Sequence, residues 1–451
     1  MTLRLLHLVI ASYALWEAWQ GAQVLRRNLL RTLVFGCIGV VHGVVPCIGP
    51  AYFERTVDPY EVHLSAGIYA LCGTLLLGFG WRLYELIASK RPYIPTFEVM
   101  REEWVQRRLN LLFLICMAGG FLAWIGNIYL SGQTLQSMLT SRRMEFRENH
   151  AGIVGGIMVH LFCMAYFPGF LAPFLKGRYR IAGIAYAVVF AAALFIFSRG
   201  TRAQAIGMLG SLIGGTILAH RISAERLFAT TTAMGLVALL AIGLVPLRYR
   251  MASMNYGEMV SFLASPEAYQ DALRQDPLNY HDHFVGIYNL FPEFVPYVDG
   301  ASYRRLMFFY LPGARFPQLK PPDPNRDVAK ALFGKAAEKT DWMHPPGVFG
   351  DIWINFHGWN GLPLMILQGM FLAWLNRRMI SNPWFFIALG PQTLYLSLVG
   401  IRGQPYTIGL AMLITLSLTY VLMRLLGLPL RPYYQQQAHV AVAPMLPQPA
   451  V

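Results

Sequence analysis

The chain has 451 residues, of which 55% are hydrophobic and only 13% are charged. Soluble domains carry about 25% charged residues, and the apolar runs of about 18 to 22 residues that recur here can each cross a hydrocarbon core of about 30 Å. These features exclude an ordinary soluble protein and predict an all-α polytopic membrane protein. The net charge of +14 does not indicate a nucleic-acid partner, because the basic residues stand in short clusters at the ends of apolar runs.

The apolar runs predict about eleven transmembrane helices that form one bundle. We expect them at about residues 3–21, 29–49, 63–86, 109–131, 151–174, 181–198, 204–220, 227–247, 354–375, 383–400 and 406–425. Residues 1–247 hold the first eight spans, 248–353 form one large polar loop, and 354–425 hold the last three spans. The tail at 426–451 is rich in Gln, Ala and Pro from Gln435 onward and is expected to be disordered.

Short basic links predict the orientation, because cytoplasmic links carry an excess of Lys and Arg. Links after alternate spans hold Arg26, Arg27, Arg31, Lys90, Arg91, Arg101, Arg107, Arg108, Lys176, Arg178, Arg180, Arg221, Arg226, Arg377, Arg378, Arg424 and Arg431. If the spans alternate, all of these links are cytoplasmic, and the large loop and the N-terminus are periplasmic. The first apolar run lacks a small-residue cleavage site, so we interpret it as a retained span.

Some expected outer links break this pattern, because they carry arginines where the insertion bias disfavours them. They hold Arg142, Arg143, Arg147, Arg199, Arg202 and Arg402. An anionic ligand bound at the outer face would account for positive charge there. Ser198-Arg199-Gly200 ends a long apolar span at this face, and an arginine fork can bind two phosphate oxygens. The alternative is an arginine that reaches lipid headgroups.

Further arginines stand at the start of the large loop and within it. Arg248 and Arg250 directly follow the eighth span and could complete an anion clamp, or could contact headgroups instead. Arg304, Arg305 and Arg315 lie deeper in the loop, and we expect two of these three to be surface charges. The loop contains no cysteine, which excludes a disulfide framework within it.

Histidines of the loop offer a general base. His281 and His283 flank Asp282, and His344 precedes the fixed turn Pro345-Pro346-Gly347. A histidine whose pKa lies near ambient pH is suited to deprotonating a sugar hydroxyl. The alternatives are a structural hydrogen-bonding role for each ring, or a zinc site built on His-x-His, for which no fourth ligand is evident.

The segment 344–361 joins the loop to the ninth span and is the most distinctive stretch of the chain. Asp351 and Asn355 are spaced i and i+4, so they would share one face if the helix has begun there. The segment also reads as a helix start with an aromatic belt of Trp353, Phe356 and Trp359. Earlier in the loop we expect helices over about 255–275, with a helix-start signal at Ser265-Pro266-Glu267, and over about 327–339, with the proline-rich stretch 312–324 extended.

Together these features resemble the O-antigen polymerase and ligase superfamily, specifically the repeat-unit polymerases called Wzy. The resemblance rests on Ser198-Arg199-Gly200, on the single large outer loop with the stretch 310–322, and on the stretch 345–361. His357 stands where this family commonly has a glycine. The similarity covers about residues 180–375, whereas the first 150 residues agree only in hydropathy.

The resemblance implies a bacterial inner-membrane glycosyltransferase that works at the periplasmic face without a cofactor or an obligatory metal. Its partners would be undecaprenyl-diphosphate-linked oligosaccharides, as donor and as acceptor, the lipid bilayer, and possible chain-length regulators. Arg199 corresponds to the diphosphate-binding arginine of the family, with Arg250 or Arg248 as its partner and Arg315 as a further candidate. Preorganised arginines would stabilise the charge that develops on the leaving group. From chemistry more than from the motif, His344 or His281 is the expected base and Asp351 its orienting residue.

Three other functions remain open at this point. A ligase that transfers finished polymer to a lipid A core or a protein would share the arginines and differ in its acceptor groove. A transporter of lipid-linked glycan would favour internal repeats, broken helices and ionisable residues at mid-membrane, and Glu17 is the only acid well inside an expected span. A non-catalytic scaffold or sensor would not need arginines placed against the insertion bias.

Overall fold

The computed structural model describes residues 2–48, 60–88, 93–130, 161–197, 202–220, 256–266, 280–308, 316, 318–321, 324–334, 346–393, 397 and 405–434. Within these ranges the fold is helical apart from one antiparallel pair of two-residue strands, β1 (Tyr93–Ile94) and β2 (Tyr433–Tyr434). Among the described residues, three helical stretches are long and apolar enough to cross a membrane, namely Leu29–Cys47, Tyr60–Ile87 and Glu103–Gly126. The predicted all-helical class with membrane-spanning character is thus confirmed at this level.

The N-terminal helices occupy the positions expected for the first four spans. They are α1 (Thr2–Gln23), the unbroken series α2 (Leu29–Ile38), η1 (Gly39–Val44) and α3 (Val45–Ile48), then α4 (Tyr60–Ile87), and after the short α5 (Thr96–Val99) the long α6 (Glu103–Leu130). The segment η1 is π-helical, a widened turn that is rare and often found at functional sites. It widens the second expected span at the point where His42 is buried.

The later helices agree with the expected spans at some points and correct them at others. α11 (Arg178–Phe197), α12 (Arg202–Ala219), α21 (Leu364–Ser381) and α24 (Pro405–Leu425) are single helices, but the described part of the fifth span is broken into η2 (Phe162–Ala165), α10 (Tyr166–Leu171) and η3 (Ala172–Phe174). Pro168 and Pro173 lie in this segment, and each removes a backbone donor. The tenth span begins with α22 (Pro383–Leu389) and η5 (Gly390–Gln392), and the eighth lies outside the described residues.

The ninth span begins later than predicted. Instead of a helix from 354, the chain forms α20 (Gly347–Asn355), a left-handed residue at His357, η4 (Gly358–Gly361) and only then α21. Positive φ at both His357 and Gly358 cannot be part of a right-handed helix, so it separates α20 from the span. α20 therefore belongs to the polar loop rather than to the ninth span.

The described parts of the large loop form short helices. These are α14 (Tyr256–Ala264), α16 (Tyr280–Leu290), α17 (Ala301–Met307), α18 (Pro324–Phe333) and α20. α14 is shorter than the predicted helix, because it ends before Ser265, whose hydroxyl donates to the Phe262 carbonyl (2.8 Å); residues 267–279 lie outside the described ranges. α18 begins at Pro324, three residues before the predicted start, and ends before the left-handed Gly334; these are the helix ends that proline and glycine favour.

The loop helices share a hydrophobic core with the spans. Phe284 of α16 and Phe349 of α20 are fully buried with Tyr69 of α4 and Phe35 of α2 in one cluster. In the same region α4 and α21 approach backbone to backbone, because a Cβ at Gly80 would lie 2.1 Å from the Ile366 carbonyl oxygen. The loop helices are therefore packed as part of the bundle, not as a separate domain.

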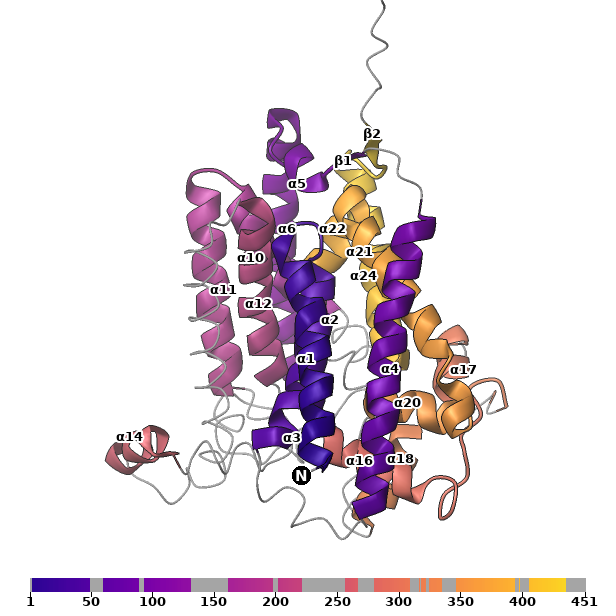
Figure 1. Ribbon diagram of the computed structural model, residues 1–451. Coiled ribbons are helices and arrows are strands. Elements are labelled where there is room, and N and C mark those ends of the chain that lie inside the picture. The colour runs from indigo at the N-terminus through magenta and orange to yellow at the C-terminus, as the bar shows by residue number, and fades with distance from the viewer. Residues whose placement is uncertain are drawn as a thin grey trace, which may run out of the picture.

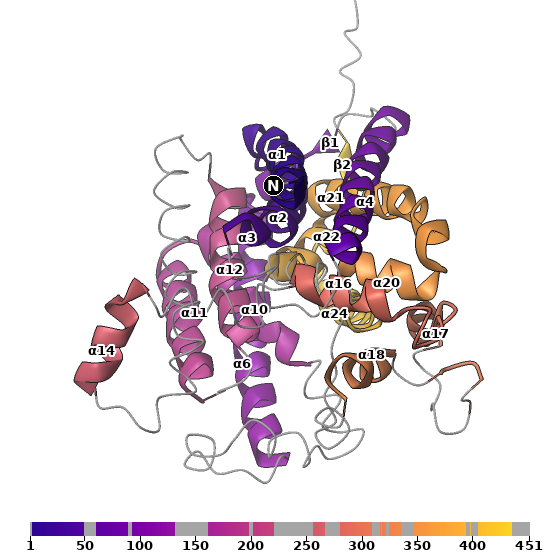
Figure 2. The same ribbon diagram turned by 60° about the horizontal axis from the view of Figure 1, so that its bottom comes forward.

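The bundle has two different ends, which we call the link end and the loop end (Figure 1). At the link end α5, β1 and β2 lie together, and Arg26 donates to the Leu218 carbonyl (3.1 Å) at the end of α12. Arg101 and Arg108 likewise donate to the Ala219 and Gly427 carbonyls. At the loop end, α16, α18 and α20 lie near α3 and the N-terminus, and Figure 2 brings this end forward.

Candidate functional site

Five of the seven predicted site residues lie outside the described ranges: Arg199, Arg248, Arg250, Arg315 and His344. The other two, His281 on α16 and Asp351 on α20, are described and lie at the loop end. Both are almost fully buried, with 0% and 3% of their surface exposed. The described site is therefore built from these two residues and their neighbours.

Asp351 lies in a compact polar cluster between α17 and α20. The Tyr303 hydroxyl donates to its Oδ2 (3.1 Å), and the Asn355 amide donates to its Oδ1 (3.2 Å) and to its backbone carbonyl (2.8 Å). Asn355 Nδ2 also approaches the Ser302 hydroxyl (3.2 Å), and Asn355 Oδ1 accepts from the Ser302 backbone N–H (3.3 Å). The predicted i, i+4 face shared by Asp351 and Asn355 is confirmed, because both lie on one helix and are bonded to each other.

Burial gives this carboxyl an unusual protonation behaviour. It raises the pKa of Asp351 to about 7, although hydrogen bonds from Tyr303 and Ser302 oppose the shift. Burial and the nearby carboxyl also raise the pKa of the Tyr303 hydroxyl, so that group stays protonated and acts as a donor. A carboxyl whose pKa lies near neutral pH can accept a proton in a reaction and release it afterwards.

His281 lies in a different environment and does not contact Asp351. Its Nδ1 is 3.3 Å from Nδ1 of His42 on η1, and its ring meets the ring of His7 on α1 edge-on at 4.4 Å between centroids. The structure therefore does not bring together the pair that we predicted as base and orienting residue. Asp351 bonds to Tyr303 and Asn355 instead, because the two residues stand on different helices and face different neighbours.

A metal site at His281 and His283 is not supported. Two residues on one helix spaced i, i+2 point in different directions, and here His281 is buried in the core while His283 contacts the Tyr280 ring (5.5 Å). Among the residues that the structure describes, no group of three or more His, Cys, Asp or Glu side chains could hold a metal ion. All five cysteines are free thiols.

Two arginines of α17 follow Tyr303 directly and are half-buried, contrary to the expectation that two of the three deeper loop arginines are surface charges. Arg305 Nη1 donates to the Pro321 carbonyl (2.6 Å), and burial together with the charge of Arg305 lowers the pKa of Lys320. Within the described ranges, no acidic side chain forms an ion pair with Arg304. This helix therefore concentrates positive charge beside the Asp351 cluster.

The edge of the site carries a strained ion pair. His357 Nε2 lies 2.9 Å from Asp299 Oδ1, and both residues have positive φ (57° and 49°), a conformation rare for residues other than glycine. Near this pair the Trp359 ring is 44% exposed and packs edge-on against Tyr69 at 5.1 Å. The left-handed backbone at His357 is one that glycine adopts without strain.

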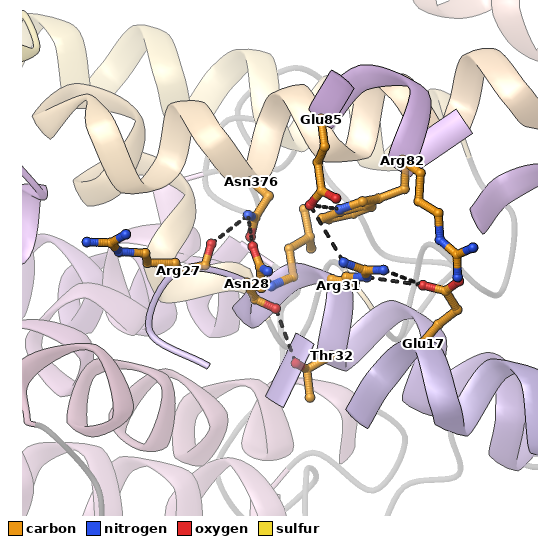
Figure 3. A network of polar contacts seen from close by, with 10 residues as sticks. Glu17, Arg27, Asn28, Arg31, Thr32, Arg82, Glu85 and Asn376 are labelled. Carbon is orange, nitrogen blue, oxygen red and sulfur yellow. Dashed lines mark hydrogen bonds and ion pairs between the residues drawn. The ribbon is translucent and has the colours of Figure 1, made fainter. Parts of the chain in front are cut away.

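A second buried charge network lies towards the link end (Figure 3). Glu17 on α1 accepts from Arg31 on α2 (2.6 and 3.2 Å to Oε2) and from Arg82 on α4. Arg31 also reaches Glu85 (3.6 Å). The only acid well inside an expected span is thus held by two arginines, and the network joins three helices rather than forming an isolated charge.

Sequence reasoning did not identify Tyr303, Ser302, His7, His42 or His63 as part of any site. Tyr303 and Ser302 carry no distinguishing local pattern. The three histidines did carry a signal, because each lies near the outer end of one of the first three expected spans. Their alternating positions place them at one face of the bilayer if the spans simply alternate.

Comparison with known proteins gives no relative on which to base a role for these residues. No protein-family model matches the chain, and neither the curated proteins nor the solved structures include a match to it.

Proposed function

We propose that the chain is a bacterial inner-membrane glycosyltransferase that joins undecaprenyl-diphosphate-linked oligosaccharide repeat units into a surface polysaccharide. In this proposal about eleven helices span the membrane and the loop 248–353 lies in the periplasm. The donor and the acceptor are both lipid-linked, and a chain-length regulator is a further possible partner. The motif order of the sequence supports this assignment, and the chemistry of the loop end is compatible with it.

The observation that carries the proposal is the Asp351 cluster. Its carboxyl has a pKa of about 7, is bonded to a tyrosine hydroxyl, and lies on a loop helix at the end opposite the basic links. A general base that deprotonates a sugar hydroxyl is most efficient when its pKa lies near the operating pH. We therefore assign Asp351 the role of base, which the sequence had given to His344 or His281.

Because Asp351 is nearly buried, we propose that the proton passes through Tyr303. The acceptor hydroxyl gives its proton to the Tyr303 oxygen while Tyr303 gives its own proton to Asp351 Oδ2. The acceptor oxygen then forms a bond to the anomeric carbon of the donor, and the bond between that carbon and the diphosphate oxygen breaks. The lipid diphosphate leaves as an anion, and the proton on Asp351 is later released to water.

Positive charge for the leaving group is available on the same helix. Arg304 and Arg305 follow Tyr303 in α17 and are half-buried, which strengthens their interaction with an anion. In the proposal they act with Arg199, the diphosphate arginine implied by the family resemblance, and with Arg248, Arg250 or Arg315. The exposed Trp359 ring and the Asp299–His357 pair offer a stacking surface and polar groups for a sugar.

The test is a glycan ladder on a gel from cells that lack the gene, complemented with the wild type, Arg199→Ala, Asp351→Asn or Tyr303→Phe. We expect deletion to reduce the ladder to one repeat unit on the lipid anchor. We expect that neither Arg199→Ala nor Asp351→Asn restores the ladder in the deletion strain. Asp327→Asn, an exposed acid of α18, is the matched control and is expected to restore the ladder.

The alternatives predict different products. If deletion leaves long chains on the lipid carrier that never reach the core lipid, the protein is a ligase. If lipid-linked units accumulate on the inner leaflet, it is a transporter. A full ladder from Asp351→Asn at wild-type intensity would remove Asp351 from the mechanism.

A further inference from the structure

Four histidines from four separate elements meet at the loop end. They are His7 (α1), His42 (η1), His63 (α4) and His281 (α16), and none has more than 2% of its surface exposed. His7 Nδ1 lies 2.8 Å from the His42 carbonyl, and His42 Nδ1 lies 3.3 Å from His281 Nδ1. His63 is close enough to act electrostatically on His7 and His281. We call this group the histidine junction.

The contact between His42 and His281 requires at least one neutral ring. A hydrogen bond between two Nδ1 atoms needs one donor and one acceptor, so it is lost when both rings are imidazolium ions. The Nε2 atoms of both rings are buried without a hydrogen-bond partner among the described residues. A proton added to either ring would therefore place a charge among apolar side chains, including the Phe349 ring, which lies 4.7 Å from the His42 ring.

Among the residues that the structure describes, no carboxylate contributes to the electrostatics of His281 in a way that would offset such a charge. The groups that act electrostatically on His281 are His7, His42 and His63. The other titratable or charged groups on the elements packed against α16, and on α16 itself, are Arg4, Tyr13, Glu17, Tyr60, Glu61, Tyr69, Cys72, Arg82, Tyr84, Glu85, Tyr280, Asp282, His283, Tyr288, Arg326, Asp327, Lys330 and Asp351. None of them contributes to the electrostatics of His281.

We propose that the histidine junction is a pH-sensitive latch, which holds α16 against α1, η1 and α4 at neutral pH and releases it when the loop face becomes acidic. α16 also packs against α20, which carries Asp351, so release would loosen one wall of the proposed active site. The latch rests on the packing of four elements and stands whether or not the chain is a glycosyltransferase.

The direction of the pH effect follows from burial. Desolvation, with repulsion from the other three histidines, lowers the pKa of His281 well below its ordinary value of 6.5. The released ring regains the ordinary value, so below pH 6.5 the released state binds more protons than the docked state. The equilibrium constant that favours docked over released α16 is therefore highest above pH 6.5. Below this pH it falls by up to about tenfold per pH unit for each histidine that gains a proton.

The experiment is hydrogen–deuterium exchange with mass spectrometry on the full chain in lipid nanodiscs at pH 7.5, 6.5 and 5.5, corrected for intrinsic exchange rates. We expect the peptide covering α16 to lose protection by about tenfold or more between pH 6.5 and 5.5, while the peptide covering α21 stays protected. The side chain at position 281 cannot gain a charge in His281→Gln. In this variant we expect the loss of α16 protection between pH 6.5 and 5.5 to be about tenfold smaller than in the wild type. His283→Gln on the same helix is the control and should behave as the wild type.

The latch is overturned if α16 keeps its protection at pH 5.5 in the wild type, or if His281→Gln retains the complete pH dependence. If His281→Gln leaves α16 unprotected already at pH 7.5, the latch is tested with His42→Gln and His63→Gln instead. Each of these variants should make the protection of α16 depend less steeply on pH. Unchanged slopes in both of these variants would also exclude the latch.

Discussion

At the link end of the bundle, arginine side chains meet carbonyl or carboxylate oxygens and remain charged, whereas at the loop end the buried ionisable groups face aromatic rings, hydroxyls and one another. Arg26 donates to a helix-terminal carbonyl, where a cation also meets the negative end of the helix dipole. His281 instead meets His42, and Asp351 meets Tyr303. The same helices thus have one end with fixed charges and one end whose protonation can change.

The difference shows that one bundle of apolar helices can hold paired charges at one end and buried titratable groups at the other. Charged side chains at the link end are paired with carbonyl or carboxylate oxygens of neighbouring helices, so they hold the helices together. Groups at the loop end have their ionised forms disfavoured by burial, so their charge state responds to the solvent and to ligands. Proton-dependent behaviour is expected at the loop end and not at the link end.

Removal of the central acid of the link-end network should have the largest effect on stability. Glu17→Gln leaves Arg31 buried without its closest counter-ion, and we expect the free energy of unfolding to fall by about 3–5 kcal/mol. Thermal unfolding of the purified protein in detergent measures the change. The matched control is Glu85→Gln, which removes a longer ion-pair contact from a side chain that is 45% exposed and should cost about 1 kcal/mol or less. Equal losses in the two variants would contradict the central position of Glu17.

Neutralisation of Asp351 should separate stability from activity at the loop end. Ionising this buried carboxyl destabilises the fold, so wild-type stability should fall as the pH rises from about 4 to 7 and then level off. Asp351→Asn should lack this fall and be about 2–4 kcal/mol more stable at pH 8. Its transfer rate should be about 100- to 10,000-fold lower, and the wild-type rate should rise with pH up to about 7.

Chemical unfolding at several pH values and an in vitro polymerisation assay measure these two effects. If Asp351→Asn destabilises the protein at pH 8, the ionised carboxyl stabilises the fold. That result would contradict the raised pKa of Asp351 and its proposed role as the base.

Removal of a single capping arginine at the link end should have a moderate effect. Arg26 donates to the Leu218 carbonyl and stacks over the Phe97 ring at 3.8 Å, so Arg26→Met should cost about 1 kcal/mol. The neighbouring Arg27 has an exposed side chain and provides the control Arg27→Ala, for which we expect little change. The midpoint of thermal unfolding would reveal the difference, and a larger loss for Arg27→Ala would refute the assignment.

The smallest expected effect concerns the strained edge of the site. His357→Gly relieves a left-handed backbone strain of about 1 kcal/mol and loses an exposed ion pair worth about 0–1 kcal/mol. His357→Ala loses the ion pair but keeps the strain, so it should be less stable than the glycine variant by about 1 kcal/mol. Denaturant unfolding of the two variants side by side measures the difference, and equal stabilities would show that the backbone is not strained.

The helical spans could be predicted because long apolar runs leave few alternatives in a bilayer, where every backbone group must be bonded within its own segment. Expected spans at 3–21, 63–86 and 406–425 correspond closely to α1, α4 and α24. The start of the ninth span was not placed correctly, because apolar residues lie on both sides of Asn355–Gly361 while the backbone turns left-handed at His357 between them. A hydropathy profile does not register such a turn.

The sequence by itself determined the helical class, the position of several long helices, and the shared face of Asp351 and Asn355, since these depend on local composition and on helical spacing. Only the tertiary structure decided that His281 joins His7, His42 and His63, and that Asp351 pairs with Tyr303. These contacts join residues that are up to 274 positions apart along the chain (7 to 281). Long-range packing of this kind determines whether a buried ring or carboxyl lies beside a charged or a neutral group. The neighbouring group in turn determines the protonation state of the ring or carboxyl, and so its chemistry.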